Sequence, residues 1–444
     1  MKLTYNVKDK PSVSKLIVFA LQQLLAILAA TIAVPSIVGN GMSQSAALFG
    51  AGVGTIVYLL FTKFNSPVFL GSSFAFLGSM FSAFGGAVSV QVGYAGLIIG
   101  AALAGLVYVI IALVVKVAGV KWINKLMPPV VIGPTVSIIG LSLAGNAVGD
   151  ALHGAALDGG AYVMTGAVWA NLICALVTLF TVIACSVKGK KMAKLIPFII
   201  GIAAGYAVAL IFTLIGRGNG NEALQLIDFS KFSNMKWVPD FTFIEAFKGF
   251  GSVTAEYIGT VAVAYVPVAF VVFAEHIADH KNLSTIIDQD LLENPGLHRT
   301  LLGDGVGSMV GAFFGGCPNT TYGESVGCVA ITGNASVITI LCTAILAIAA
   351  SFFGPFVTLL STIPSCVMGG VCITLYGFIA VSGLKMLQPV DLNDNRNLFT
   401  ASVILICGIG GMTLKIGAVT LTEVACALIL GIIVNLVFNK RSAQ

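Results

Sequence analysis

The sequence predicts an all-α integral membrane protein that crosses the bilayer about fourteen times. Of its 444 residues, 57% are hydrophobic and only 9% are charged, whereas soluble domains carry about 25% charged residues. The apolar residues form runs near the length of about 20 that a spanning helix needs. The net charge of +5 comes from basic residues in short segments between these runs, so it does not indicate a nucleic-acid-binding protein.

The expected spans follow from these runs, and the tenth is an interrupted stretch that overlaps the end of the ninth. In chain order they cover about 15–37, 45–62, 67–84, 93–115, 128–148, 165–186, 195–215, 257–278, 301–316, 311–327, 336–353, 357–384, 398–416 and 421–438. The polar, partly aromatic stretch at about 217–255 is expected to lie along the membrane surface as an interfacial helix. The first run follows a basic N-terminus without a clear cleavage site, so we expect a retained span and not a signal peptide.

The basic residues indicate the orientation of the chain. With the N-terminus in the cytoplasm, the Lys and Arg residues left outside are Arg217, Lys231, Lys236, Lys248 and Lys415. The remaining 18 of the 23 (23 minus 5) lie inside, as the positive-inside rule requires. We therefore expect both termini to lie in the cytoplasm.

Two of the expected spans are interrupted. The stretch 311–327 reads GAFFGGCPNTTYGESVG, and its Pro318 removes a backbone donor and clashes with the preceding turn. Span 67–84 also opens with a proline, Pro67, and continues through Gly and Ser. Each is the third span in its half of seven spans. Because seven is odd, the second half would start on the opposite side of the membrane from the first, and the halves would be inverted repeats. Paired broken segments indicate the substrate site of a secondary transporter; the alternative is a kinked, Gly-rich packing helix.

Acidic residues at membrane depth are candidates for chemistry. Those within or at the edges of the expected spans are Glu256, Glu275, Asp279, Asp304, Glu324 and Glu423. An ionised carboxylate in a dry cavity is costly unless it is paired or hydrogen-bonded, so it requires an N–H-rich ligand, a cation or a proton. Glu324 lies inside the interrupted stretch, whereas Glu275 and Asp279 lie near a helix end, where a position at the water boundary is the alternative.

His276 and His280 lie one helical turn apart. Two histidines at this spacing can bind zinc, but no third ligand is evident, so we expect no metal and no other cofactor. The titration range of histidine favours a role in handling protons, with a solvated helix end as the alternative for His280. The nine cysteines include no C-x-x-C pair and are expected to be buried apolar residues. Because no nucleophile–base pair is apparent, we do not expect an enzyme.

Four motifs occur in the order GSSFAF at 71–76, AEHIADH at 274–280, NPGLHR at 294–299 and PNTTYGESVGCVAITG at 318–333. Together they resemble the bacterial uracil permeases of the nucleobase–ascorbate transporter family, along nearly the whole chain. The family signature begins at Glu324, and Glu at this position is similar to the uracil branch, whereas the purine branch more often carries Gln. Ser325 stands where the family usually has Asn.

The resemblance implies fourteen spans in two inverted repeats of seven, divided between a core domain and a gate domain. The core would comprise residues 1–126 (spans 1–4) and 217–355 (spans 8–11), and the gate 127–216 (spans 5–7) and 356–444 (spans 12–14). The third and tenth spans would each contain a short strand and a half helix. A homodimer formed through the gate domain is also implied.

The resemblance further implies a site for uracil, a flat ring with two N–H groups and two carbonyls. Glu275 and Glu324 would accept hydrogen bonds from the N–H groups, and the backbone N–H groups of Phe74 and Gly323 would reach the carbonyls. Phe74 would also stack on the ring. The other residues expected around the ring, the last of them in the gate, are Ala30, Ser73, Tyr322 and Tyr376. The candidates for proton coupling are Glu275, Asp279 and His280, with Asp279 where family members often have His.

The expected function is therefore proton-coupled import of uracil across the inner membrane, with the bilayer, the nucleobase and protons as partners. A xanthine or uric acid permease is the alternative within the family. An anion exchanger or channel of the same architecture is the alternative of another class, but its site would favour a positive lining over two acidic residues.

Overall fold

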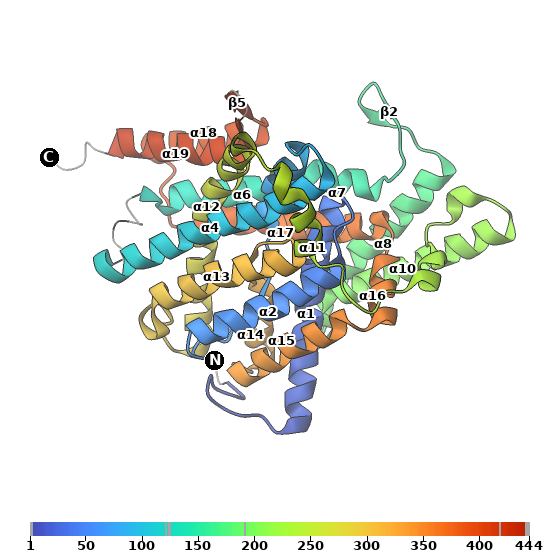
Figure 1. Cartoon of the computed structure of the whole chain (residues 1–444), viewed down its shortest axis with the longest axis horizontal. Helices are drawn as coiled ribbons and strands as arrows, with labels where there is room; N and C mark the ends of the chain where they lie inside the picture. The colour runs from blue at the N-terminus through green and yellow to red at the C-terminus, as the bar shows by residue number, and fades with distance from the viewer. Residues whose placement is uncertain (1–2, 120–121, 123–125, 191, 417–418, 440–444) are drawn as a thin grey trace. The chain divides into compact units, whose positions relative to one another are not determined.

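The computed structural model describes residues 3–119, 122, 126–190, 192–416 and 419–439 (Figure 1). Within this part, eight helices are long and apolar enough to cross a membrane, or nine if one bent pair counts as a span. They are α1 (Val13–Val38), α2 (Gln44–Phe61), α4 (Val90–Ala118), α6 with α7 (Pro129–Ala151), α8 (Gly166–Lys188), α10 (Pro197–Gly218), α12 (Ala255–Ile287) and α17 (Ser365–Met386). The chain is therefore a multi-pass membrane protein, as its composition predicts.

Shorter helices lie where the remaining spans are expected. They are α3 (Leu77–Gly85), α13 (Leu297–Gly315), α14 (Gly323–Thr332), α15 (Val337–Ser351), α18 (Asn395–Ile409) and α19 (Glu423–Asn439). The bent pair consists of α15 and α16 (Gly354–Ser361), whose axes differ by 81°. Several helices begin at a Ser or Thr whose hydroxyl accepts a backbone N–H of the first turn, for example Ser43 before α2 and Thr254 before α12.

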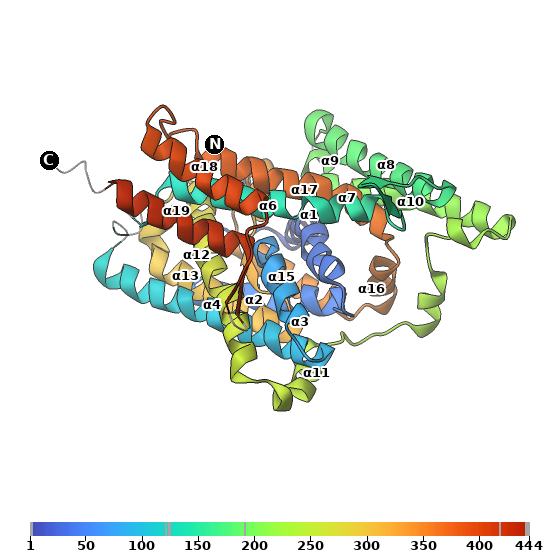
Figure 2. The same ribbon diagram turned by 90° about the horizontal axis from the view of Figure 1, so that it is seen from above.

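The helices form two compact units. The first comprises Met1–Ser142, Pro239–Ala349 and Ile379–Gln444, and the second comprises Leu143–Val238 and Ala350–Phe378. Within the first unit, α13 packs against both α2 and α4, and α4 also packs against α12 (Figure 1). In the same unit α18 packs against α19 and α6 (Figure 2). Within the second unit, α8 and α10 pack against each other.

Glycines let α2 and α13 approach closely. Gly50 faces Gly311 and Gly54 faces Gly307. A methyl group at Gly50, Gly54 or Gly307 would collide with the facing backbone, and one at Gly311 would collide with the Asn319 side chain. Both helices thus carry two glycines four residues apart, the small-residue pattern that brings spanning helices into close contact. This contact fixes α13 next to the segment that contains the substrate-site candidates.

Three regions differ from the expected spans. The expected span 357–384 is divided into α16 and α17, because Pro364 disfavours a helical conformation at the preceding residue. The stretch 217–255 contains short turns and the single helix α11 (Thr242–Gly249) in place of one long interfacial helix. Two hairpins also occur in the loops. Their strands are β2 (Leu157–Asp158) with β3 (Ala161–Tyr162), and β5 (Leu414–Ile416) with β6 (Val419–Leu421).

Candidate functional site

The two interrupted segments meet in the first unit. Strand β1 (Leu70–Ser72) pairs antiparallel with β4 (Asn319–Thr321), with Leu70 opposite Thr321 and Ser72 opposite Asn319. The turn η1 (Phe74–Phe76) and helix α3 follow β1, and α14 follows β4 directly. Both half helices therefore begin at the strand crossing, where the N–H groups of a first helical turn lack partners within their own helix. Such paired helix starts at membrane depth suit the binding of a polar solute.

Side chains from both segments and from α2 hold the crossing together. The Tyr322 hydroxyl donates to the carbonyl of Ser72 at 2.7 Å, and its ring occupies the space that a side chain at Gly71 would fill. The Thr55 hydroxyl accepts from the N–H of Leu70 at 2.9 Å. The Asn319 amide donates to the carbonyl of Gly50 at 3.1 Å. The strands are thus fixed by buried hydrogen bonds, and the site has a rigid base.

Three carboxyl groups converge on the start of α14. Glu324 lies in its first turn, and Glu275 and Asp279 lie one turn apart on α12, which packs against α14. The three groups are close enough to interact electrostatically. Asp279 accepts a hydrogen bond of 2.9 Å from the Thr321 hydroxyl, and its other oxygen lies 4.0 Å from where a Cβ on Gly323 would stand.

None of these three acids belongs to an ion pair within the described part of the chain. All three are half-buried. A half-buried carboxylate without a cation requires hydrogen-bond donors. The site therefore favours a neutral ligand with N–H groups, or protons, over an anion.

The other expected ring-lining residues divide between the two units. Phe74, Ser73 and Tyr322 lie at the crossing and are buried. Ala30 is buried on α1, which packs against both β1 and α14. Tyr376 is buried on α17 in the second unit and is not among the residues that the first unit brings together.

The two histidines lie away from the carboxyl cluster. Both side chains are fully buried at 0% exposure, so the alternative of a solvated helix end for His280 is wrong. His280 lies 2.7 Å from the Tyr58 hydroxyl through Nε2 and 2.8 Å from the carbonyl of His276 through Nδ1. His276 lies 2.8 Å from Asp304 and 2.9 Å from the Thr300 hydroxyl. These contacts join α12 to α2 and α13, whereas Asp279 on the same helix faces β4.

Sequence reasoning missed Gln23 as a part of the site. The Ser325 hydroxyl accepts from the N–H of Phe69 at 3.0 Å and from the Gln23 amide at 2.5 Å. Ser325 thus uses its oxygen to connect α14 with α1 and with the residue before β1. A glutamine inside the first apolar run was the signal that could have identified Gln23.

Replacement of Ser325 by Ala is expected to lower the stability of the protein by about 1–3 kcal/mol, because the buried N–H of Phe69 would lose its partner. The measurement is the thermal unfolding of the purified protein in detergent. Ser402→Ala is the matched control, since that hydroxyl is exposed and donates only within α18. Equal unfolding temperatures for the two variants would contradict the structural role of Ser325.

Comparison with solved structures identifies a known membrane-protein fold. The chain resembles the transmembrane domain of a cyanobacterium bicarbonate transporter, BicA, with a TM-score of 0.64 and 15% sequence identity. The match covers 96% of this chain and 98% of that chain. At this level of identity the likeness concerns the fold alone.

Sequence comparison gives the family. A permease family model matches residues 14–417. The uracil permease of Bacillus caldolyticus is 42% identical over 445 residues, which cover 99% of this chain and 96% of the relative. The uracil permease of Bacillus subtilis (strain 168) is 40% identical over 448 residues, which cover 100% of this chain and 97% of the relative. The chain belongs to this permease family, and the resemblance drawn from the four motifs is confirmed.

Proposed function

We propose that this protein takes up uracil by symport with protons. The observation that carries the proposal is the carboxyl cluster at the strand crossing, beside the starts of two half helices. The names of the relatives that match over the full chain support uracil as the solute. In the proposed complex, Glu275 and Glu324 accept the two ring N–H groups. The backbone N–H groups of Phe74 and Gly323 donate to the carbonyls.

The remaining contacts enclose the ring. Phe74 stacks on it, and Ala30, Ser73 and Tyr322 complete the wall that the first unit supplies. Tyr376 is the remaining residue that we propose to contact the ring. A planar wall with a few acceptors and donors is the usual composition of a small-molecule site.

Protons enter through the same cluster. Glu275 and Asp279 are the proposed coupling residues, because a proton shared among neighbouring half-buried carboxyl groups lowers their mutual repulsion. His280 is the weaker candidate, since its ring is enclosed by Tyr58 and the carbonyl of His276. Binding of uracil and of a proton would then be coupled in one place.

The proposed topology has fourteen spans in two inverted repeats of seven. Eight long helices and six shorter or interrupted segments, of which β1 with α3 and β4 with α14 are the third and tenth, supply that number. The domains would be a core of residues 1–126 and 217–355 and a gate of residues 127–216 and 356–444. We place the protein in the inner membrane with both termini in the cytoplasm, as a homodimer through the gate.

Uptake of radiolabelled uracil into cells or proteoliposomes tests the function. We expect saturable uptake that unlabelled uracil abolishes and that xanthine and urate leave largely intact. Equal competition by all three would contradict uracil as the preferred solute.

A separate prediction concerns the coupling ion. Uptake of uracil should rise as the external pH falls, and a protonophore should reduce it strongly, because an inward proton gradient drives a symporter. The measurement is the initial uptake rate in proteoliposomes with an imposed pH gradient, and an equal sodium gradient at constant pH serves as the control. Uptake that ignores the pH gradient would rule out proton coupling while leaving uracil as the solute.

A further inference from the structure

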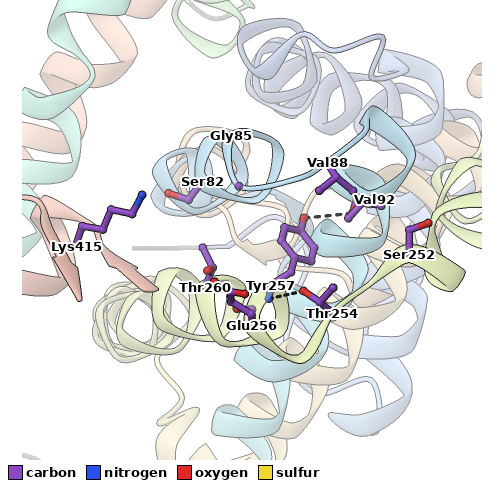
Figure 3. A pocket seen from close by; sticks show the side chains of 11 residues that line it. Ser82, Gly85, Val88, Val92, Ser252, Thr254, Glu256, Tyr257, Thr260 and Lys415 are labelled. Atoms are coloured by element: carbon purple, nitrogen blue, oxygen red, sulfur yellow. Dashed lines mark hydrogen bonds between the residues drawn. The ribbon is translucent and has the colours of Figure 1, made fainter. Parts of the chain in front are cut away.

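A cavity lies in the first unit, away from the carboxyl cluster. It has a volume of about 620 Å³ and is lined by the end of α3, the start of α4, the start of α12 and strand β5 (Figure 3). We call it the α3–α12 cavity. Its polar lining residues are Ser82, Ser252, Thr254, Glu256, Thr260 and Lys415. The volume lies within the range of about 300–1,000 Å³ that small-molecule sites occupy.

Opposite charges lie on different walls of this cavity. Figure 3 shows Lys415 extending from β5 toward the cavity, while Glu256 and Tyr257 lie on α12 across from it. Among the described residues, neither Glu256 nor Lys415 belongs to an ion pair. One wall thus offers a donor that is free to bind a carbonyl, and the other offers an acceptor that is free to bind an N–H group.

A buried tyrosine fixes the wall of the cavity that carries Glu256. The Tyr257 hydroxyl donates to the carbonyl of Ala83 at 2.6 Å and lies 3.2 Å from that of Val92. On α4, Gly96 leaves the space that this hydroxyl occupies. Only 6% of Tyr257 is exposed, so this residue holds α12 against α3 and α4, and the wall that carries Glu256 is preformed.

The cavity and the carboxyl cluster share two structural elements. The half helix α3 begins beside Phe74 at the strand crossing and ends at the cavity, where Ser82 lines it. Along α12, Glu256 precedes Glu275 by 19 residues, or about 28 Å of helix. The cavity therefore lies at the end of the elements that build the main site. In the proposed orientation this end faces outward.

We propose that the α3–α12 cavity is a second, weaker binding site for a neutral heterocycle with N–H and carbonyl groups. Lys415 donates to a ring carbonyl, and Glu256 accepts from a ring N–H. The identity of the solute as uracil rests on the proposed function. The site holds the solute at the mouth before it reaches Glu275 and Glu324.

Cysteine labelling separates this site from the main one. Ser252 is exposed on the lining of the cavity, so Ser252→Cys in purified protein should react with a maleimide, measured against the background of the native cysteines. Uracil should protect this cysteine. The concentration of uracil needed for protection should stay unchanged when Glu324→Gln is added. It should rise at least about threefold when Lys415→Ala is added, because a partly exposed charged contact is lost.

Transport kinetics provide the second test. Lys415→Ala and Glu256→Gln should each raise the KM for uracil uptake at least about twofold with little change in maximal rate. Lys248→Ala and Glu245→Gln are matched controls, because this pair is exposed on α11 and does not line the cavity. Either of two results would overturn the second site. One is that uracil no longer protects the cysteine at position 252 when Glu324→Gln is present. The other is that Lys415→Ala changes neither this protection nor the KM. Absence of uracil uptake by the wild-type protein would instead overturn the proposed function.

Discussion

Glu324→Gln is expected to weaken uracil binding by at least about tenfold, because a hydrogen bond to a charged group is worth about 1.5–3 kcal/mol. The substitution keeps the size and shape of the side chain in the first turn of α14 and removes its charge. It also replaces one of the two acceptor oxygens by an NH2 group that only donates, so a single neutral acceptor is left for the ring N–H. The measurement is equilibrium binding of labelled uracil to purified protein.

The control for this experiment is Glu293→Gln, which changes an exposed acid in the loop before α13. We expect its affinity for uracil to match that of the wild type. Glu275→Gln should weaken binding as Glu324→Gln does, since both acids are proposed to accept ring N–H groups. Undiminished affinity in Glu324→Gln, with a folded protein, would remove Glu324 from the ligand contacts.

The positions of both helix interruptions could be predicted from the sequence. Pro67 and Pro318 act on the backbone of the adjoining turn, so their effect is local and can be read without knowledge of the fold. The pairing between the segments is a different matter. The bond from Tyr322 to Ser72 joins residues 250 positions apart, and no local pattern specifies which strand meets which.

Some residues of the candidate site could be predicted from the sequence, and the surroundings of others could not. Glu324, Glu275 and Asp279 were recognisable because acids are rare in apolar segments, and the structure brings them together. The burial of His280 could not be predicted, because the Tyr58 hydroxyl that it contacts belongs to a helix 222 positions away. Periodicity gives the residues that share a helix face, but it does not say which face meets protein and which meets water.

The partner of Asp304 could not be predicted for the same reason, because the sequence shows this residue only as an acid within an expected span. In the structure it faces His276 at 2.8 Å, and both side chains are almost completely buried. His276 also lies 2.9 Å from the Thr300 hydroxyl through Nε2, and this hydroxyl is 3.0 Å from the carbonyl of Leu297. The buried imidazole therefore has a polar partner at each of its two nitrogens.

Asp304→Ala is expected to lower the stability of the protein by about 3–5 kcal/mol, because it leaves the buried His276 without its partner. This loss would loosen α12 from α13 next to Glu275, so uracil affinity should fall along with stability. The measurement is unfolding of the purified protein in detergent, followed by heat or denaturant. The matched control is Arg396→Ala, which breaks the exposed pair with Asp394 but keeps Asp394 as the N-cap of α18. It should leave the unfolding temperature unchanged, since exposed pairs contribute little. If both variants unfold alike, the buried pair does not hold these helices together.

Asp304→Asn separates the effect of the ionic charge from that of the hydrogen bond, because an amide can still contact Nδ1 of His276. If Asp304→Asn keeps the stability that Asp304→Ala loses, then the hydrogen bond, and not the ionic charge, secures α12.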